Sequence, residues 1–151
     1  MALYMRGIKS IIGSLTLIAD DNALLEIQFK SSMQNDHSKI LDLAQKELEL
    51  YFARKLKIFT VPQNPRGTSY QCKCWQTLQK IKYGQTISYK DQATQVANAK
   101  HTRSVAQANS KNPIPIIIPC HRVIASNGDI GGYAGGLKMK KILIGLEQDS
   151  N

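Results

Sequence analysis

Cys120 and His121 are the neighbouring residues of this sequence best suited to chemistry, because a nearby base can convert a thiol into a nucleophilic thiolate. They lie within residues 112–123, which hold three of the five prolines and the apolar run 116–118. Each proline fixes φ and lacks a backbone donor, so this segment is neither a regular helix nor a central strand. The isoleucines favour burial. We therefore expect a stiff, partly buried mount for the two side chains.

The same two residues also have a purely structural interpretation. A lone cysteine is commonly an inert, buried small residue. Neighbours in an extended segment point to opposite sides, which prevents direct contact between thiol and imidazole. On these residues alone, a nucleophile and a core cysteine remain equally open. A zinc site joining Cys72 and Cys74 to this pair is disfavoured, because structural zinc hooks separate paired cysteines by about two to four residues, and we expect no metal.

Residues 1–62 have the pattern of a small scaffold domain. Two β-rich runs, 14–19 and 23–29, flank a polar turn and predict a hairpin. Together with the run 3–12 they predict a small antiparallel sheet. Apolar residues at helical spacing predict a helix that packs on this sheet and that Asp36 caps. We find no catalytic chemistry in this part of the chain.

Residues 63–151 predict a mostly helical domain. Thr68 and Gln71 form a capping box at the start of its first helix. Two shorter helices follow, one beginning at Ser88 and one capped by Thr102, and the tight turn between them predicts a helix-turn-helix. An ordinary helical hairpin fits the same pattern. The small side chains of the second helix nevertheless permit close approach to a nucleic acid.

A glycine-rich loop follows the cysteine. Residues 129–138 include four glycines, which let the backbone approach a flat ligand and present N–H donors. Tyr133 and Leu137 indicate that the loop is held in place. A final helix is predicted from about Lys138 to near Glu147. The sequence thus predicts an α+β fold, in which a sheet-and-helix domain precedes a mostly helical domain with a helix-turn-helix and an active-site loop.

The positive charge of the chain is concentrated in its later part. The formal net charge is +9; residues 1–62 hold eight Lys/Arg and seven Asp/Glu (8 − 7 = +1), and residues 63–151 hold twelve and four (12 − 4 = +8). This asymmetry favours a polyanionic partner for the later part, although a merely basic surface gives the same totals. No secretory signal or bilayer-spanning run is visible. We expect a soluble, cytoplasmic protein.

The motif Pro-Cys-His-Arg-Val at 119–123, with Asn112-Pro113 before it and Gly-Gly-Tyr-Ala-Gly-Gly after it, resembles the active-site signature of the O6-alkylguanine-DNA alkyltransferases. These are the methylated-DNA–protein-cysteine methyltransferases, and the resemblance covers about residues 67–147. It implies repair of double-stranded DNA by flipping out an O6-alkylguanine and moving its alkyl group irreversibly to Cys120. It further implies one event per molecule, no cofactor, no membrane and a monomeric protein.

The resemblance also implies roles for other residues. His121 would be a general base that acts through a water molecule, with Glu147 orienting it; Asn112 would tie the loop together, and Tyr89 would donate to the departing base. The implied substrate-binding residues are Val123, Tyr133, Ala134 and Gly135. Arg103 would be the arginine finger that replaces the flipped nucleotide, and the other expected DNA contacts are Lys90, Ala106, Ser110 and Ser126.

The sequence departs from the family pattern at two positions. Ala134 stands where the family often has serine, which removes a hydroxyl but keeps the backbone N–H. Gln92 stands where the family usually has leucine, which places a polar group at a core position. Two other functions remain as alternatives: a non-catalytic module that binds alkylated bases, and a cysteine hydrolase. The cysteine argues against the first, because relatives of that type lack it.

Overall fold

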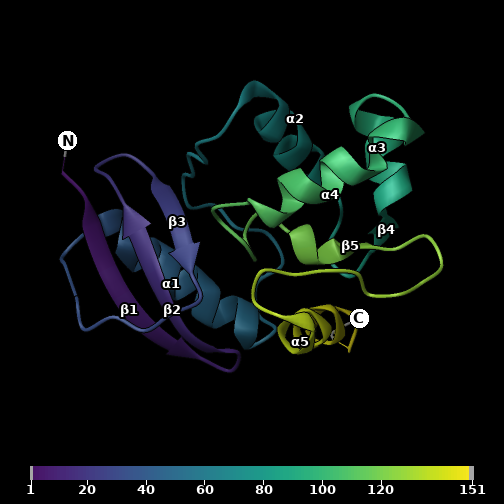
Figure 1. Cartoon of the computed structure of the whole chain (residues 1–151). Helices are drawn as coiled ribbons and strands as arrows, with labels where there is room; N and C mark the ends of the chain where they lie inside the picture. Colours follow the sequence, from purple (N-terminus) through teal and green to yellow (C-terminus); the bar gives the residue numbers. More distant parts are fainter. Residues whose placement is uncertain (1, 150–151) are drawn as a thin grey trace. The chain divides into compact units, whose positions relative to one another are not determined.

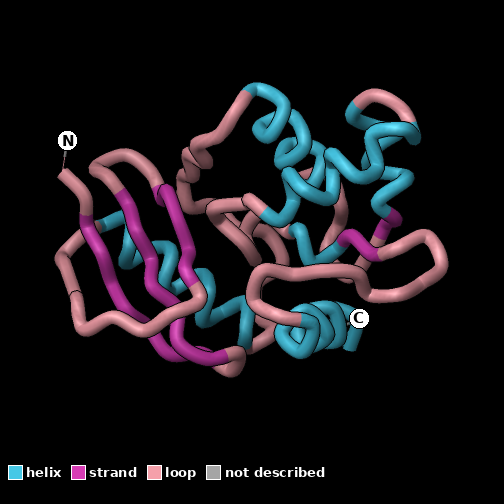
Figure 2. The backbone as a smooth tube through the Cα atoms, in the orientation of Figure 1, coloured by secondary structure: helices cyan, strands magenta, loops and turns pink. Residues whose placement is uncertain are grey.

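The structure is a computed structural model that describes residues 2–149. The chain divides into two compact units, Met1–Arg66 and Gly67–Asn151 (Figure 1). The first unit holds an antiparallel sheet and a helix, and the second is mostly helical (Figure 2). The predicted α+β fold class is therefore confirmed.

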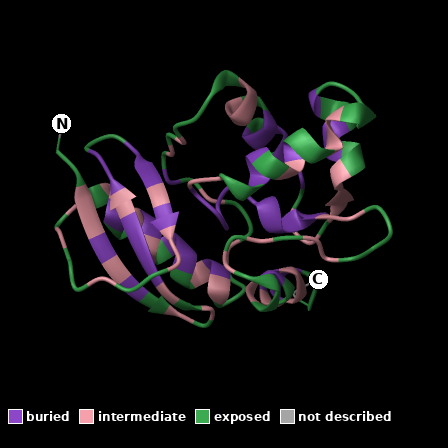
Figure 3. Ribbon diagram, viewed as in Figure 1, coloured by how far each residue is buried: buried purple, intermediate pink, exposed green. Residues whose placement is uncertain are grey.

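The first unit is a three-stranded antiparallel sheet covered by a helix. Its strands β1 (Tyr4–Ser10), β2 (Gly13–Ala19) and β3 (Leu24–Gln28) pair in chain order, so the predicted hairpin is present. Helix α1 (Lys39–Phe52) packs against all three strands. Buried residues alternate with less buried ones along the strands and along α1 (Figure 3). The buried apolar residues of the strands and the helix form the core of this unit.

The cap of α1 differs from the prediction. Ser38 caps the helix by accepting a hydrogen bond from the Leu41 N–H, whereas Asp36 lies before the helix. The Asp36 carboxylate accepts from the Met5 N–H at 2.8 Å, and its backbone carbonyl accepts from Arg6 at 2.7 Å. Asp36 is therefore held beside β1. The prediction was wrong because this tertiary pairing is not visible in the local sequence.

The first unit extends a few residues beyond the expected boundary at residue 62. The Leu24 N–H donates to the Pro62 carbonyl at 2.8 Å, and the Asn64 N–H donates to the Leu24 carbonyl at 2.9 Å. These two bonds attach residues 62–64 to the edge of β3. The compact unit consequently ends at Arg66.

Within residues 67–149, the second unit has four α-helices, two 3-10 helices and two very short strands. The elements are α2 (Ser69–Leu78), β4 (Ile87–Ser88), α3 (Tyr89–Val96), the 3-10 helix η1 (Ala99–His101), α4 (Thr102–Ser110), the 3-10 helix η2 (Cys120–Arg122), β5 (Val123–Ile124) and α5 (Leu137–Asp149). Strands β4 and β5 pair in parallel. Helices α2, α3 and α4 pack on one another. Cys74 lies in their core, as predicted.

Two predicted helix starts in this unit are confirmed and one is wrong. Thr68 and Ser88 each form a capping box with the residue three positions later. Thr102 is not a cap but the first residue of α4, and its hydroxyl donates to the Ala99 carbonyl at 2.7 Å. Helix η1 runs directly into α4, so the start of α4 has no side-chain cap.

Within residues 2–149, no helix is both long and apolar enough to span a membrane. The same residues contain no group of three or more His, Cys, Asp or Glu side chains arranged to hold a metal ion.

Candidate active site

A tight loop at residues 112–119 supports the cysteine. Asn112 stitches the loop together, since its Oδ1 accepts from the Ile114 N–H at 3.0 Å and its Nδ2 donates to the Ile118 carbonyl at 2.8 Å. Ile116 is fully buried and has φ of 76°, a backbone conformation that costs a β-branched residue about 1–3 kcal/mol. Only a firmly packed loop maintains such a conformation. The expected stiff, buried mount is therefore present.

Cys120 and His121 lie on a turn of 3-10 helix instead of an extended segment. A 3-10 helix has about three residues per turn, so its successive side chains leave the backbone in different directions. Cys120 borders a cavity, whereas His121 bonds to α5 behind it. The turn thus places the Cys120 thiol at the cavity and the His121 imidazole in a buried polar network.

The cavity at Cys120 has the volume of a small-molecule site. Its volume is about 360 Å³, within the range typical of small-molecule sites. Cys120 itself is 8% exposed. The lining residues come from α3, α4, the turn at the cysteine and the glycine-rich loop: Tyr89, Ala106, Asn109, Ser110, Cys120, Gly132, Tyr133 and Ala134.

The thiol of Cys120 is protonated at rest. Burial raises its pKa, against the opposing effects of a hydrogen bond from Asn112 and the positive charge of Lys140. A thiol in this state needs a proton acceptor before it can act as a nucleophile. The nearest imidazole, His121, is the evident candidate.

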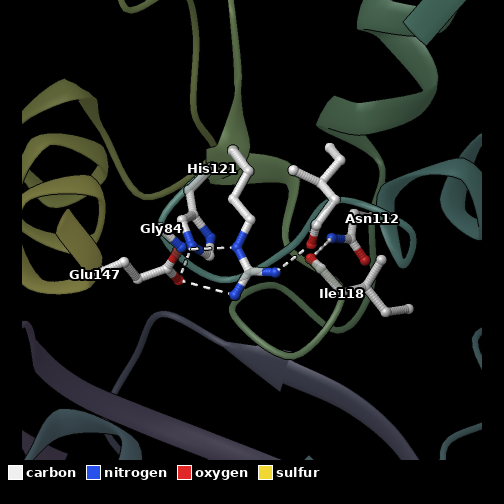
Figure 4. A network of polar contacts seen from close by, with 7 residues as sticks. Gly84, Asn112, Ile118, His121 and Glu147 are labelled. Atoms are coloured by element: carbon white, nitrogen blue, oxygen red, sulfur yellow. Dashed lines mark hydrogen bonds and ion pairs between the residues drawn. The ribbon is translucent and has the colours of Figure 1, made fainter. Parts of the chain in front are cut away.

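Glu147 lies at the centre of a buried ionic network behind Cys120 (Figure 4). Its carboxylate is 2.6 Å from His121 Nε2 and accepts from Arg122 Nε at 2.8 Å and Nη2 at 3.1 Å. The Gly84 N–H adds a fourth contact at 3.3 Å. Burial raises the pKa of Glu147, but the bonds from His121 and then Arg122 outweigh it and lower the pKa to about 2. Glu147 is therefore ionised at neutral pH.

This ionised carboxylate fixes the tautomer of His121. A carboxylate only accepts hydrogen bonds, so Nε2 carries the ring proton and donates it to Glu147. Nδ1 of the neutral ring is then the basic nitrogen, and it is buried without a hydrogen bond to any described protein atom. Burial lowers the pKa of His121, and the charges of Arg122 and Lys140 oppose protonation further, against the raising effect of Glu147. His121 is thus a neutral proton acceptor at rest.

Lys140 is a buried cation that the sequence analysis did not identify. Its Nζ donates to the Val123 carbonyl at 2.6 Å, to the Gly132 carbonyl at 3.0 Å and to the Tyr89 hydroxyl at 3.4 Å. Burial lowers its pKa to about 8. Lys140 therefore fastens the glycine-rich loop to β5 and places positive charge near the cysteine.

Two tyrosines complete the cavity wall. The Tyr89 hydroxyl is 3.5 Å from the Gly132 carbonyl, and burial followed by the nearby Cys120 raises its pKa. Burial likewise raises the pKa of Tyr133. Both phenols are protonated at neutral pH, so each can donate a hydrogen bond to a group in the cavity.

The predicted site residues occupy three kinds of position. Tyr89, Tyr133, Ala134, Ala106 and Ser110 join Cys120 around the cavity. Asn112, His121, Glu147 and Val123 lie behind it as supports, and Gly135 packs against Met139 and Tyr133. Arg103, Lys90 and Ser126 are exposed on the surface.

Sequence reasoning missed Lys140, Arg122 and Asn109. Lys140 belongs to a lysine-rich helix start and has no local sign of burial. Arg122 was in the recognised motif but was given no role. Asn109 falls among the small residues of α4, and its partner Gln92 was noted only as a departure. The pair could have been predicted from the presence of two polar residues at core-facing positions of neighbouring helices.

Comparisons with known proteins agree with this arrangement. Residues 69–149 match the family described as 6-O-methylguanine DNA methyltransferase, DNA binding domain, and residues 3–65 match its ribonuclease-like domain. A methylated-DNA–protein-cysteine methyltransferase of Methanosarcina acetivorans is 38% identical, over 96% of this chain and 98% of the relative. The constitutive enzyme of Bacillus subtilis is 41% identical, over 82% of this chain and 78% of the relative.

Solved structures of O6-methylguanine methyltransferases have the same fold as this chain. The O6-methylguanine methyltransferase of Mycobacterium tuberculosis superimposes with a TM-score of 0.89 at 35% identity, covering 99% of this chain and 95% of that one. Its complex with DNA matches equally well, with a TM-score of 0.89 at 37% identity over 97% and 94% of the two chains. The fold and site define a cysteine-based alkyl acceptor. This chain belongs to the 6-O-methylguanine DNA methyltransferase family.

Proposed function

We propose that Cys120 is the alkyl acceptor with which this protein performs the reaction of its family. The activity is repair of alkylated DNA by transfer of the alkyl group to a protein cysteine. One observation carries the assignment to Cys120: its thiol borders a cavity of about 360 Å³ while a neutral histidine and an ionised carboxylate lie behind it. By contrast, Cys74 is enclosed in the helical core.

The buried network supports a proton relay. A water molecule between Sγ of Cys120 and Nδ1 of His121 would carry the thiol proton to the imidazole, and Glu147 would stabilise the resulting imidazolium. The thiolate then attacks the alkyl carbon, a C–S bond forms, and the bond from that carbon to guanine O6 breaks. The electron pair of that bond stays on guanine.

Tyr89 supports departure of the base. Displacement at a saturated carbon leaves negative charge on the guanine, and a phenol on the cavity wall can donate a hydrogen bond or a proton to it. Lys140 lies 3.4 Å from this hydroxyl and favours any negative charge that develops there. The proton that His121 takes from the thiol is released to solvent and replaces the one that guanine gains, so guanine leaves neutral, His121 is neutral again and Cys120 ends as a neutral thioether.

Helices α3 and α4 are the proposed DNA-reading pair, acting as a helix-turn-helix. Arg103 is exposed at the start of α4, from where it can fill the space of a guanine flipped from the stack. Lys90 and Ser126 are exposed and available to phosphates, and Ala106 and Ser110 connect α4 to the cavity. We also propose that the protein acts as a monomer in the cytoplasm and that Val123, Ala134 and Gly135 help to hold the flipped base.

Intact-mass analysis with a duplex that contains O6-methylguanine tests the assignment. The unaltered protein should gain the mass of one CH2 group, mapped to Cys120, while Cys120→Ala should gain none. Cys72→Ala is the matched control, because Cys72 lies outside the cavity, and it should react like the unaltered protein. Retained binding to the lesion without an adduct in the unaltered protein would instead support a non-catalytic module.

A further inference from the structure

Two amide side chains are buried between α3 and α4, and one of them, Asn109, belongs to a residue that lines the Cys120 cavity. Gln92 is fully buried and Asn109 is 7% exposed. Gln92 Nε2 donates to Asn109 Oδ1 at 3.0 Å, and Asn109 Nδ2 donates back to Gln92 Oε1 at 2.7 Å. The two amides therefore form a closed pair of hydrogen bonds.

Helix α2 fixes the orientation of this pair. Gln92 Nε2 also lies 3.1 Å from Thr77 Oγ1 and 3.3 Å from the Cys74 carbonyl. A carbonyl can only accept, so the nitrogen of Gln92 must face α2 and its oxygen must receive the Asn109 N–H. Rotation of either amide would break several buried bonds, each of which is costly to leave unmade.

Asn109 retains unused hydrogen-bonding capacity beside Cys120. An asparagine amide offers two N–H groups and two acceptor lone pairs, and the pairing with Gln92 uses one of each. Among residues 2–149, Gln92 is the only side-chain partner of the Asn109 amide. Asn109 lines the same cavity as Cys120. An alkyl group on its way to Sγ thus lies in a space lined by Asn109, a residue whose amide is fixed and incompletely bonded.

We propose that Asn109, locked by Gln92, makes this site selective for O6-alkyl groups with a hydrogen-bonding end over apolar groups of the same size. The inference rests on the proposed transfer to Cys120 and names the substrate class within it. A 2-hydroxyethyl group can bond to the amide, whereas a propyl group of equal length covers it without a bond. The reaction is the same for both groups: a C–S bond forms and the bond to guanine O6 breaks.

Transfer rates from three duplexes test this selectivity. They contain O6-(2-hydroxyethyl)guanine, O6-propylguanine or O6-methylguanine, and the last one reports the basic reaction. The variant is Gln92→Leu with Asn109→Leu, which replaces both partners by apolar side chains of similar shape and leaves neither amide unpaired. Gln95→Leu, an exposed change of the same type on α3, is the matched control.

The unaltered protein and the control should react faster with the hydroxyethyl lesion than with the propyl lesion, by about two- to tenfold, as one net hydrogen bond allows. The double variant should lose that preference. Equal rates in the unaltered protein, or a preference that survives in a folded double variant, overturn the proposal. If the unaltered protein transfers no methyl group to Cys120, the proposed function on which this proposal rests is refuted instead.

Discussion

The two units of this molecule use buried charge in different ways. In the first unit, Glu47 is buried and accepts from the Thr60 and Val61 N–H groups, so one carboxylate stabilises one loop. In the second unit, Glu147 is similarly buried, but it also pairs with the side chains of His121 and Arg122, which can carry charge themselves. A carboxylate that pairs with backbone is a structural support. A carboxylate that pairs with an imidazole next to a cavity can take part in proton transfer.

The formal net charge follows the same division. Residues 1–66 hold nine Lys/Arg and seven Asp/Glu (9 − 7 = +2), whereas residues 67–151 hold eleven and four (11 − 4 = +7). The basic unit is also the one that contains Cys120, its cavity and the buried network. Attraction of a polyanion and chemistry on it are thus assigned to one compact unit.

The largest difference is expected between Glu147→Gln and Glu47→Gln. Loss of the carboxylate beside His121 should slow alkyl transfer by about a hundredfold or more, the usual contribution of a positioned proton acceptor. Glu47→Gln should lower the free energy of unfolding by about 1–3 kcal/mol and leave the transfer rate unchanged. Single-turnover kinetics and denaturant melts measure both. Equal rate losses in the two variants would remove the distinction between the units.

Arg103→Ala distinguishes base flipping in duplex DNA from alkyl transfer to Cys120, both of which we assign to the second unit. The variant should repair O6-methylguanine in a duplex about ten- to a hundredfold more slowly, because a flipped base costs a few kcal/mol when nothing replaces it in the stack. Its reaction with free O6-benzylguanine should be unchanged, and this serves as the internal control. A similar loss with the free base would show that Arg103 is not the finger.

Lys140→Met tests the buried cation, with Lys141→Met as its exposed neighbour on α5. The first change removes charge near Cys120 and releases the Val123 and Gly132 carbonyls, so transfer should slow by about tenfold. The second should have no effect on the rate. Identical behaviour of the two variants in single-turnover assays would argue against a role for Lys140.

The last prediction concerns the free energy of unfolding in acid, which should depend on the charge of Glu147. The pKa of Glu147 is about 2 in the folded protein, below its ordinary value of 4.5. Its contribution of roughly 3 kcal/mol is therefore fully present above pH 4.5 and is lost as the pH falls toward 2. Melting curves between these values should show a steeper loss for the unaltered protein than for Glu147→Gln. Parallel curves would contradict the ionic network.

Local sequence signals anticipated much of the fold. The polar turn between two β-rich runs predicted the hairpin, and the spacing of Thr68 and Gln71 predicted the start of α2, because both are set by residues close in the chain. Asp36 and Thr102 were wrongly given as caps. Each lies where a contact with another segment decides the local geometry.

The residues of the site were predicted only where the family resemblance assigned them a role. Cys120, Tyr89 and Tyr133 do meet at one cavity, and His121 does meet Glu147 across 26 positions of sequence. The role of Lys140 could not be predicted. Its acceptors are backbone carbonyls of β5 and the glycine-rich loop, and every residue has a backbone carbonyl whatever its type. The Gln92–Asn109 pair was missed for a related reason: each amide has its partner on another helix, so neither residue alone indicates the pairing.

The role of Cys120 is tested most sharply by the number of alkyl groups that each molecule accepts and by the residue that carries them. With an excess of O6-methylguanine duplex, every chain should gain one methyl group, located on the peptide that contains Cys120, and no further lesion should be repaired. Repair of more than one lesion per chain, or a methyl group on Cys72 or Cys74 with Cys120 unmodified, would contradict this role.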